Sequence, residues 1–185
     1  MLITCGIDEA GRGSIAGGVC AAAVILPPDF PFEILGDSKA ISQKKRQYIE
    51  EIIKEKSLGW AVGWATHKEI DELNILNATL KAMKEAYLKL KKGFGNIDLV
   101  LVDGNIGPKL DTDVKTVIKG DTKVYEIMAA SIIAKNSRDR LMVALSPFFP
   151  EYGYEKHKGY PTKEHLEYCR LNGLSPIARH SFKIR

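Results

Sequence analysis

Residues 2–13 read LITCGIDEAGRG, an apolar run that ends in two acids and a glycine-rich turn. The run at 2–7 is too short for a stable helix, so we expect a strand there. A second apolar run, at 19–26, follows the turn and predicts a second strand. Two strands joined in this way place Asp8 and Glu9 where the first strand ends, beside glycines that let the backbone approach a ligand closely.

Three further strands and four helices are predicted along the rest of the chain. Apolar and aromatic residues alternate within 58–65, which is typical of a strand with one aromatic face. The continuous apolar run at 97–102 predicts a strand buried on both faces, and 113–118 predicts a short fifth strand. Helical periodicity is found at 42–55 with Ser42 as the cap, at 77–92 with Gly93 as the end, after Asp121, and at 162–171.

This order of elements favours an α/β fold in which helices pack on a mixed sheet, although the order of the strands does not follow from the pattern. A chain of 185 residues with 45% apolar composition is long enough for one sizeable core. No repeat, low-complexity run or linker divides it. We therefore expect a single domain over 1–185.

Composition narrows the class of protein. No run approaches the roughly 20 apolar residues of a membrane span, and the first residues do not form a secretion signal, so we expect a cytoplasmic monomer with no membrane contact. Cys5, Cys20 and Cys169 lack the spacing of a metal site and are interpreted as free buried thiols. The net charge of +4 favours a polyanionic partner only weakly.

Acids recur where the predicted strands end. Asp103 follows the fourth apolar run, and Asp121 follows the fifth within a Lys-Gly-Asp turn. If the first and fourth strands are neighbours, their acids converge at one edge of the sheet, where crowded carboxylates need a cation between them. Carboxylate oxygens without His or Cys favour Mg²⁺ or Mn²⁺. Two such ions can hold a phosphodiester and activate water, so the sequence predicts a metal-dependent phosphodiesterase with Asp8, Glu9, Asp103 and Asp121 as ligands.

Each of these patterns also has a purely structural interpretation. Acids at strand ends are often solvated turn residues. Gly11-Arg12-Gly13 is either a plain tight turn or a place where backbone contacts a sugar or phosphate; a strand follows it, so the helix that a dinucleotide loop needs is missing. Residues 152–160 interleave aromatic and basic side chains, which fits a nucleic-acid groove or a tail packed on the core. The histidines at 157, 165 and 180 are interpreted as structural.

Seven motifs follow one another along the chain. They are GIDEAGRG at 6–13, DSK at 37–39, NAT at 77–79, VDG at 102–104, KGD at 119–121, AASIIAK at 129–135 and HKGY at 157–160. In this order they closely resemble the ribonuclease HII family, the type 2 ribonucleases H, over nearly the whole chain. The resemblance implies a ribonuclease H-like fold with a central five-stranded mixed sheet flanked by helices.

The same resemblance implies an endonuclease that cleaves the RNA strand of RNA–DNA hybrids. Its members also nick duplex DNA on the 5′ side of a single embedded ribonucleotide, leaving a 3′ hydroxyl and a 5′ phosphate. The catalytic, metal-binding acids of the family fall on Asp8, Glu9, Asp103 and Asp121, with Mg²⁺ or Mn²⁺ as cofactor. The backbone of Gly11, Arg12 and Gly13 would contact the ribose 2′ hydroxyl, and Tyr160 would stack on the following deoxyribose.

The resemblance to the family implies roles for other residues less directly. Family motifs also contain the expected phosphate contacts Lys39, Asn77, Thr79 and Ser131, and residues 147–185 are expected to form a substrate-contacting segment of the domain. Ser14 and Gly18 stand where the family usually has proline, which puts the rigidity of that loop in question. Asp139 is interpreted as an ion-pair partner of Arg138 or Arg140, with a place near the metals as the alternative.

Two competing functions remain open at this point. One is a related metal-dependent nuclease or resolvase that acts on branched or purely DNA substrates with the same acids. The other is a non-catalytic nucleic-acid-binding module, in which basic surface does the binding and the acids are incidental. Substrate choice separates the first from ribonuclease HII, and replacing Asp103 separates the second.

Overall fold

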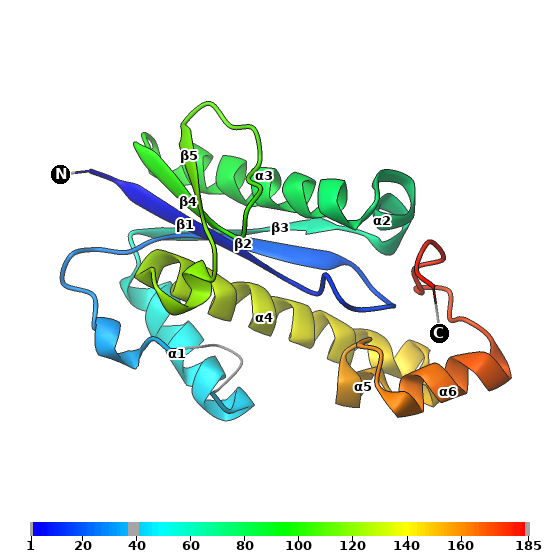
Figure 1. The fold of residues 1–185 in the computed structure, drawn as a ribbon. Coiled ribbons are helices and arrows are strands. Elements are labelled where there is room, and N and C mark those ends of the chain that lie inside the picture. The colour runs from blue at the N-terminus through cyan, green and yellow to red at the C-terminus, as the bar shows by residue number, and fades with distance from the viewer. Residues whose placement is uncertain (1, 37–40, 184–185) are drawn as a thin grey trace.

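A five-stranded sheet forms the centre of the computed structural model, which describes residues 2–36 and 41–183 (Figure 1). The strands are β1 (Thr4–Ala10), β2 (Val19–Ile25), β3 (Gly59–Ala65), β4 (Leu99–Asp103) and β5 (Asp113–Val117). Their order in the sheet is β3-β2-β1-β4-β5. The pairs β1–β2 and β2–β3 are antiparallel, whereas β1–β4 and β4–β5 are parallel. The predicted α/β fold with a mixed five-stranded sheet is therefore confirmed.

Helices cover both faces of the sheet (Figure 1). One face carries α2 (His67–Leu73) and α3 (Ile75–Phe94), and the other carries α4 (Tyr125–Leu145), with α1 (Gln43–Lys56) packed against α4. Two shorter helices, α5 (Tyr154–His157) and α6 (Lys163–Asn172), follow near the end of α4. Single 3₁₀ turns lie at Phe32–Ile34, Gly120–Thr122, Ser146–Phe148 and Pro150–Tyr152. Within the described residues, no helix has the length and apolar character of a membrane span.

Glycines in the sheet set how closely the two long helices approach it. A Cβ at Gly63 would lie 2.1 Å from the Ala82 carbonyl oxygen of α3, and a Cβ at Gly6 would lie 2.2 Å from the Glu126 carbonyl carbon of α4. Neither distance leaves room for a side chain, so the backbones of helix and strand are in direct contact at these positions. The helices are thus held in fixed positions over β1, which carries two of the predicted acids.

The element boundaries correct several sequence predictions. β1 continues to Ala10 because the alanines of β2 pair with its acid-containing end, so Asp8 and Glu9 lie within the strand and not after it. Leu99 and Leu101 of β4 are only half-buried, which corrects the expectation of burial on both faces. α3 runs through Gly93 and ends at Phe94, with Gly95 as its cap, and the separate helix α2 was not predicted. The cap at Ser42 and the three free buried cysteines are confirmed.

Candidate active site

The central strand pair brings the first two acids together. β1 and β4 are parallel, with Ile7 opposite Val102, so the next residues along the two strands are Asp8 and Asp103. Side chains alternate between the faces of a sheet, and Gly6, two residues before Asp8, packs on α4. Asp8 therefore points towards the face that α4 covers. The predicted convergence of the first and fourth strands is confirmed.

Hydrogen bonds fix the acids in place. The Asp8 carboxylate accepts from the Glu9 N–H at 2.7 Å and from the Ser131 side chain on α4. Asp103 Oδ1 accepts from the Gly120 N–H at 2.6 Å, and the Asp121 N–H lies 3.4 Å from the same oxygen. The turn that contains Asp121 is thereby tied directly to the end of β4.

The acids oppose one another's ionisation. Burial raises the pKa of Asp8 well above its usual range, and the negative charges of Glu9 and Asp103 raise it further. Burial also raises the pKa of Glu9; Arg12, 3.3 Å away, counteracts this shift, and Asp103 adds to it. A positive ion between these side chains would offset the cost of burying the carboxylate charges and would relieve their mutual repulsion.

The donor set suits a hard divalent cation, because the acids offer only carboxylate oxygens. The side chains of the described residues do not, however, form a group of three or more His, Cys, Asp or Glu already arranged around a metal position. Asp8, Glu9 and Asp103 share one cavity, while Asp121 is buried beside Asp103. The residues thus fit the ion by their chemistry and proximity.

The cavity beside these acids has a volume of about 490 Å³ and joins the acids to the glycine turn. Its lining consists of Asp8, Glu9, Ala10, Gly11, Arg12, Gly13, Asp103, Ser131, Lys135 and Tyr160. The lining therefore combines three acids with two cations, Arg12 and Lys135. The predicted site residues from four separate stretches of chain meet here, which the sequence order alone does not show.

The two glycines of the turn differ in their surroundings. Gly11 has φ +97°, and a Cβ there would lie 1.9 Å from Arg138 Nε, so this position requires glycine on both grounds. A Cβ at Gly13 would meet no atom within 4 Å. Gly13 therefore leaves its backbone open on the side where a ligand can approach.

Comparison with known proteins agrees with this geometry. The family model for ribonuclease HII matches residues 5–185. The chain belongs to the ribonuclease HII family. It is 51% identical to ribonuclease HII of Treponema denticola, with 98% of each chain covered, and 52% identical to that of Vibrio parahaemolyticus, with 96% of this chain and 83% of the relative covered. Ribonucleases HII are hydrolytic nucleases of nucleic acids that depend on divalent metal ions, and the chain is an enzyme of this class.

Solved structures share the fold. The structure of the PCNA:RNase HII complex from Archaeoglobus fulgidus matches with a TM-score of 0.77 at 24% identity, covering 100% of this chain and 96% of the other. Bst-RNase HIII in complex with Mn²⁺ matches with a TM-score of 0.77 at 19% identity, covering 99% and 68%. At these identities the likeness establishes the ribonuclease H-like fold.

Not every residue of the ribonuclease HII motifs lies in the cavity. Ser131 does, and its side chain holds Asp8. Thr79 is buried in α3 and donates to the Ile75 carbonyl oxygen at 2.7 Å, which corrects its expected contact with phosphate. Asn77 is exposed near the start of α3 and outside the cavity lining, so its phosphate contact stays a prediction. Lys39, with the rest of its motif, lies outside the described residues.

Two residues of α4 were assigned incompletely from the sequence. Lys135 lines the ribonuclease HII cavity and sits 5.0 Å from the centre of the Tyr160 ring, although it was not among the predicted site residues. It lies four positions after Ser131, so helical spacing would have placed both on one face. Asp139 pairs with Lys135 at 2.8 Å and with Arg46 at 3.2 Å, which corrects the predicted pairing with Arg138 or Arg140.

The aromatic residues of 152–160 divide between core and cavity. Tyr152 and Tyr154 stack with ring centres 5.8 Å apart, and Tyr154 is fully buried, so the structural interpretation holds for these two. Tyr160 alone among them lines the acid cavity. His157 and His165 stack at 4.2 Å and bond to backbone carbonyl oxygens, which confirms their structural role.

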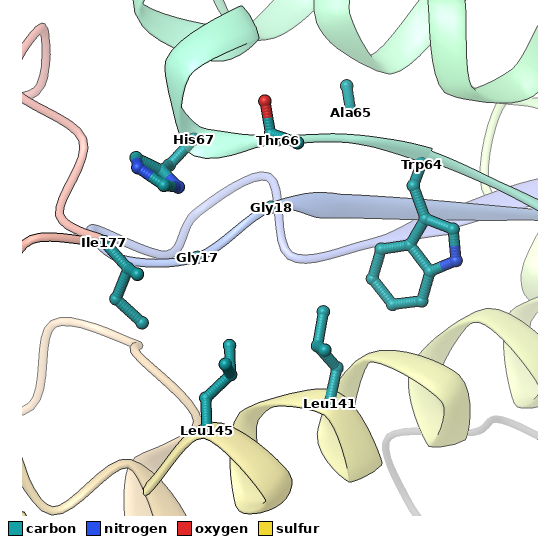
Figure 2. A pocket seen from close by; sticks show the side chains of 9 residues that line it. All are labelled: Gly17, Gly18, Trp64, Ala65, Thr66, His67, Leu141, Leu145 and Ile177. Atoms are coloured by element: carbon teal, nitrogen blue, oxygen red, sulfur yellow. The ribbon is translucent and has the colours of Figure 1, made fainter. Parts of the chain in front are cut away.

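A second cavity lies beyond the glycine turn (Figure 2). It has a volume of about 550 Å³ and is lined by apolar side chains such as Trp64, Leu141 and Ile177, which Figure 2 shows around it. No acid lines it, and His67 is the one ionisable side chain among its lining residues. The apolar cavity therefore offers no carboxylate ligands for a divalent metal ion.

Proposed function

We propose that the chain is an endonuclease that cleaves the RNA strand of RNA–DNA hybrids. It also nicks duplex DNA on the 5′ side of a single embedded ribonucleotide, leaving a 3′ hydroxyl and a 5′ phosphate. The observation that carries the proposal is the shared cavity: three of the four acids, the open backbone at Gly13 and the Tyr160 ring line one space. A phosphodiester and the sugar beside it can therefore be recognised together.

The acids Asp8, Glu9, Asp103 and Asp121 would hold the divalent ions, Mg²⁺ or Mn²⁺. Bound there, the ions would ready a water for attack and stabilise charge on the leaving oxygen. Ser131 orients Asp8, and the backbone N–H of Gly120 orients Asp103, so the ligands are fixed before an ion binds. A Mn²⁺ complex among the structures that share the fold supports this cofactor.

Two cationic side chains of the cavity, Arg12 and Lys135, would bind substrate and not metal. Arg12 and Lys135 line the same cavity as the acids, where they can contact phosphate oxygens of the substrate. Each is also held by a neighbouring acid, Arg12 by Glu9 and Lys135 by Asp139. These ion pairs restrain both side chains.

Sugar recognition explains the preference for RNA. The backbone of Gly11-Arg12-Gly13 would hydrogen-bond the ribose 2′ hydroxyl, which DNA lacks. The Tyr160 ring would cover the following deoxyribose, whose flat apolar side needs no polar partner. We further propose that 1–185 acts as one catalytic domain, with 147–185 contacting the substrate, and that it works as a cytoplasmic monomer.

A nicking assay tests the substrate. The substrates are a DNA duplex with one ribonucleotide, an RNA–DNA hybrid and the matching all-DNA duplex, each with Mg²⁺, Mn²⁺ or a chelator. We expect the first two to be cut with metal, and the all-DNA duplex to stay whole. Equal cutting of all three would instead favour a general nuclease or resolvase.

Replacing Asp103 tests the chemistry. Asp103→Asn removes one charge from the metal site, and removal of one preorganised electrostatic group typically lowers kcat by about 100-fold or more. Hybrid binding should be largely kept, because Asp103 is not a phosphate contact. Asp113→Asn, an exposed acid of β5, is the matched control and should behave like the wild type. Unchanged turnover by Asp103→Asn would favour the non-catalytic binding module.

A further inference from the structure

Two arginines are buried behind the glycine turn, where neither contacts the cavity. Arg138, on α4, is fully buried, and Arg179, near the carboxyl end, is 1% exposed. We propose that Arg138 and Arg179 are positioning residues that hold the 11–18 backbone and Tyr160 in the arrangement needed to recognise the ribose 2′ hydroxyl. The inference rests on the function proposed above and adds to it the groups on which its specificity depends.

Arg138 joins α4, which carries it, to two other segments, 16–18 and 158–160, through one guanidinium. Its Nε donates to the Gly18 carbonyl oxygen at 3.0 Å, Nη2 to that of Ala16 at 3.0 Å, and Nη1 to that of Lys158 at 2.9 Å. The plane of the same group lies over the Tyr160 ring, 5.2 Å from its centre. A single side chain thus fixes the spacing between the 11–18 loop and the ring.

Arg179 holds the other side of the loop. Its guanidinium donates to the carbonyl oxygens of Gly11 at 2.7 Å, Arg12 at 3.0 Å, Gly17 at 2.9 Å and Gly18 at 3.1 Å. The carbonyls of Gly11 and Arg12 belong to the motif that would contact the hydroxyl. Because these oxygens point back to Arg179, the orientation of the adjoining peptide groups, including their N–H groups, is fixed as well.

The bonding partners of both arginines are backbone carbonyls. Neither arginine forms an ion pair with a carboxylate in the described part of the chain, so two buried positive charges stand close together behind the loop. Burial, together with the charge of Arg138, lowers the pKa of Arg179 to about 9. Burying two like charges is costly, which argues that the fold keeps them for the loop and not for its own stability.

Only arginine can make this set of contacts. Its planar fork of donors reaches several carbonyls at fixed angles, whereas lysine offers a point charge on a flexible stem. The loop lacks the backbone restraint that proline rings would give, since Ser14 and Gly18 occupy positions where the family usually has proline. The two guanidiniums bond four of the carbonyls from Gly11 to Gly17 and bond Gly18 twice, and they supply restraint from outside the loop.

The test compares Arg138→Lys and Arg179→Lys with the wild type and with Lys92→Arg, an equally conservative exchange at an exposed residue of α3, as control. The substrates are duplexes that differ at one sugar, with a 2′ hydroxyl or a 2′ fluorine at the scissile nucleotide. We expect kcat on the hydroxyl substrate to fall by about 100-fold, the usual cost of misplacing a reacting group by about 1 Å, with little change in KM. The preference for hydroxyl over fluorine should fall with it.

A destabilised enzyme would lose both activities in proportion, so an unchanged hydroxyl preference in both variants would overturn the inference. Amide hydrogen exchange gives a readout that does not depend on activity. The bonded N–H groups of Ser14, Ile15 and Gly17 should exchange faster in the variants, while amides of the sheet keep their protection. If the wild type nicks no substrate, the proposed function fails, and exchange alone then decides whether the arginines hold the loop; unchanged exchange refutes it.

Discussion

At the scale of single residues, two neighbouring cations hold the Tyr160 ring in position. Two cations lie close to the ring: the Lys135 ammonium is 5.0 Å from its centre, and the Arg138 guanidinium is 5.2 Å from it. Cations over a ring face hold it by electrostatic attraction. The ring also lines the acid cavity, so Tyr160 presents an oriented apolar surface to a sugar.

The ring and not the hydroxyl should matter for catalysis. The Tyr160 hydroxyl makes no hydrogen bond with a described residue, so Tyr160→Phe should keep nearly full activity. Tyr160→Ala should lower kcat/KM by roughly 10- to 100-fold, because stacking on one aromatic ring is worth about 1–3 kcal/mol. Steady-state kinetics on the single-ribonucleotide duplex measures both variants. Tyr48→Ala, which removes an exposed ring of α1, serves as the control, and an equal loss in the Phe and Ala variants would refute a stacking role.

The sequence pattern predicted that Asp8 and Asp103 lie close together, but it did not predict the residues that surround them. Asp8 and Asp103 were predicted because an acid at the end of a strand has a fixed position once its strand has a neighbour. Lys135 and the partners of Asp139 depend on which face α4 turns to the sheet and on where α1 crosses it. Those contacts join residues from separate elements, so spacing along the chain carries no direct record of them.

At the scale of elements, the sheet was predicted more completely than the helices around it. Strand positions follow from short apolar runs, and all five were found. The seven-residue helix α2 was missed because its apolar content is small, although Thr66 and Glu69 form a capping box that the sequence does contain. The order of strands needed the structure, since the chain passes from β3 at one edge to β4 beyond β1.

Close packing of α3 on the sheet gives an element-scale prediction. A Cβ at Gly63 would lie 2.1 Å from the Ala82 carbonyl oxygen, so Gly63→Ala must push β3 and α3 apart. We expect it to cost about 3 kcal/mol of unfolding free energy, since overpacking is strongly destabilising where only backbone can move. For a domain of this size that corresponds to a fall in Tm of roughly 6–12 °C, measured by thermal denaturation.

The matched control for this change lies in α3 itself. Gly93 is helical, and a Cβ there meets no atom within 4 Å. Gly93→Ala should raise stability by about 0.5–1 kcal/mol, because alanine loses less backbone entropy than glycine on folding into a helix. Gly63 packs on the face away from α4, so kcat of the folded Gly63→Ala enzyme should stay near that of the wild type. A Gly63 variant as stable as the Gly93 variant would contradict the packing argument.

At the scale of the whole molecule, ion pairs join the amino-terminal and central helices. Glu50 of α1 accepts from both Nη atoms of Arg140 on α4, at 2.6 and 2.7 Å, from Lys54 at 2.7 Å and from Asn136 at 2.9 Å. The bidentate contact with Arg140 is the stronger kind of ion pair. Because α4 also carries Ser131 and Lys135, this contact joins α1 to the helix that forms one wall of the site.

The response to acid should reveal this contact. Burial tends to raise the pKa of Glu50, but the bonds from Arg140 and Lys54 outweigh it and hold the pKa below the ordinary value of 4.5. A carboxyl with a lowered pKa in the folded state stabilises the fold above its ordinary pKa and loses that contribution as the pH falls through the lowered value.

Glu50→Gln should therefore cost about 1–3 kcal/mol of unfolding free energy at pH 7, a figure reduced by the partial exposure of Arg140 and Lys54. The difference from the wild type should shrink as the pH falls below 4.5 and through the lowered pKa of Glu50, because the wild-type carboxyl then becomes protonated too. Urea unfolding at each pH measures this difference, with Glu55→Gln on the exposed side of α1 as the control. A cost for Glu50→Gln that stays constant across this pH range would show that the ion pair contributes nothing to the link between α1 and α4.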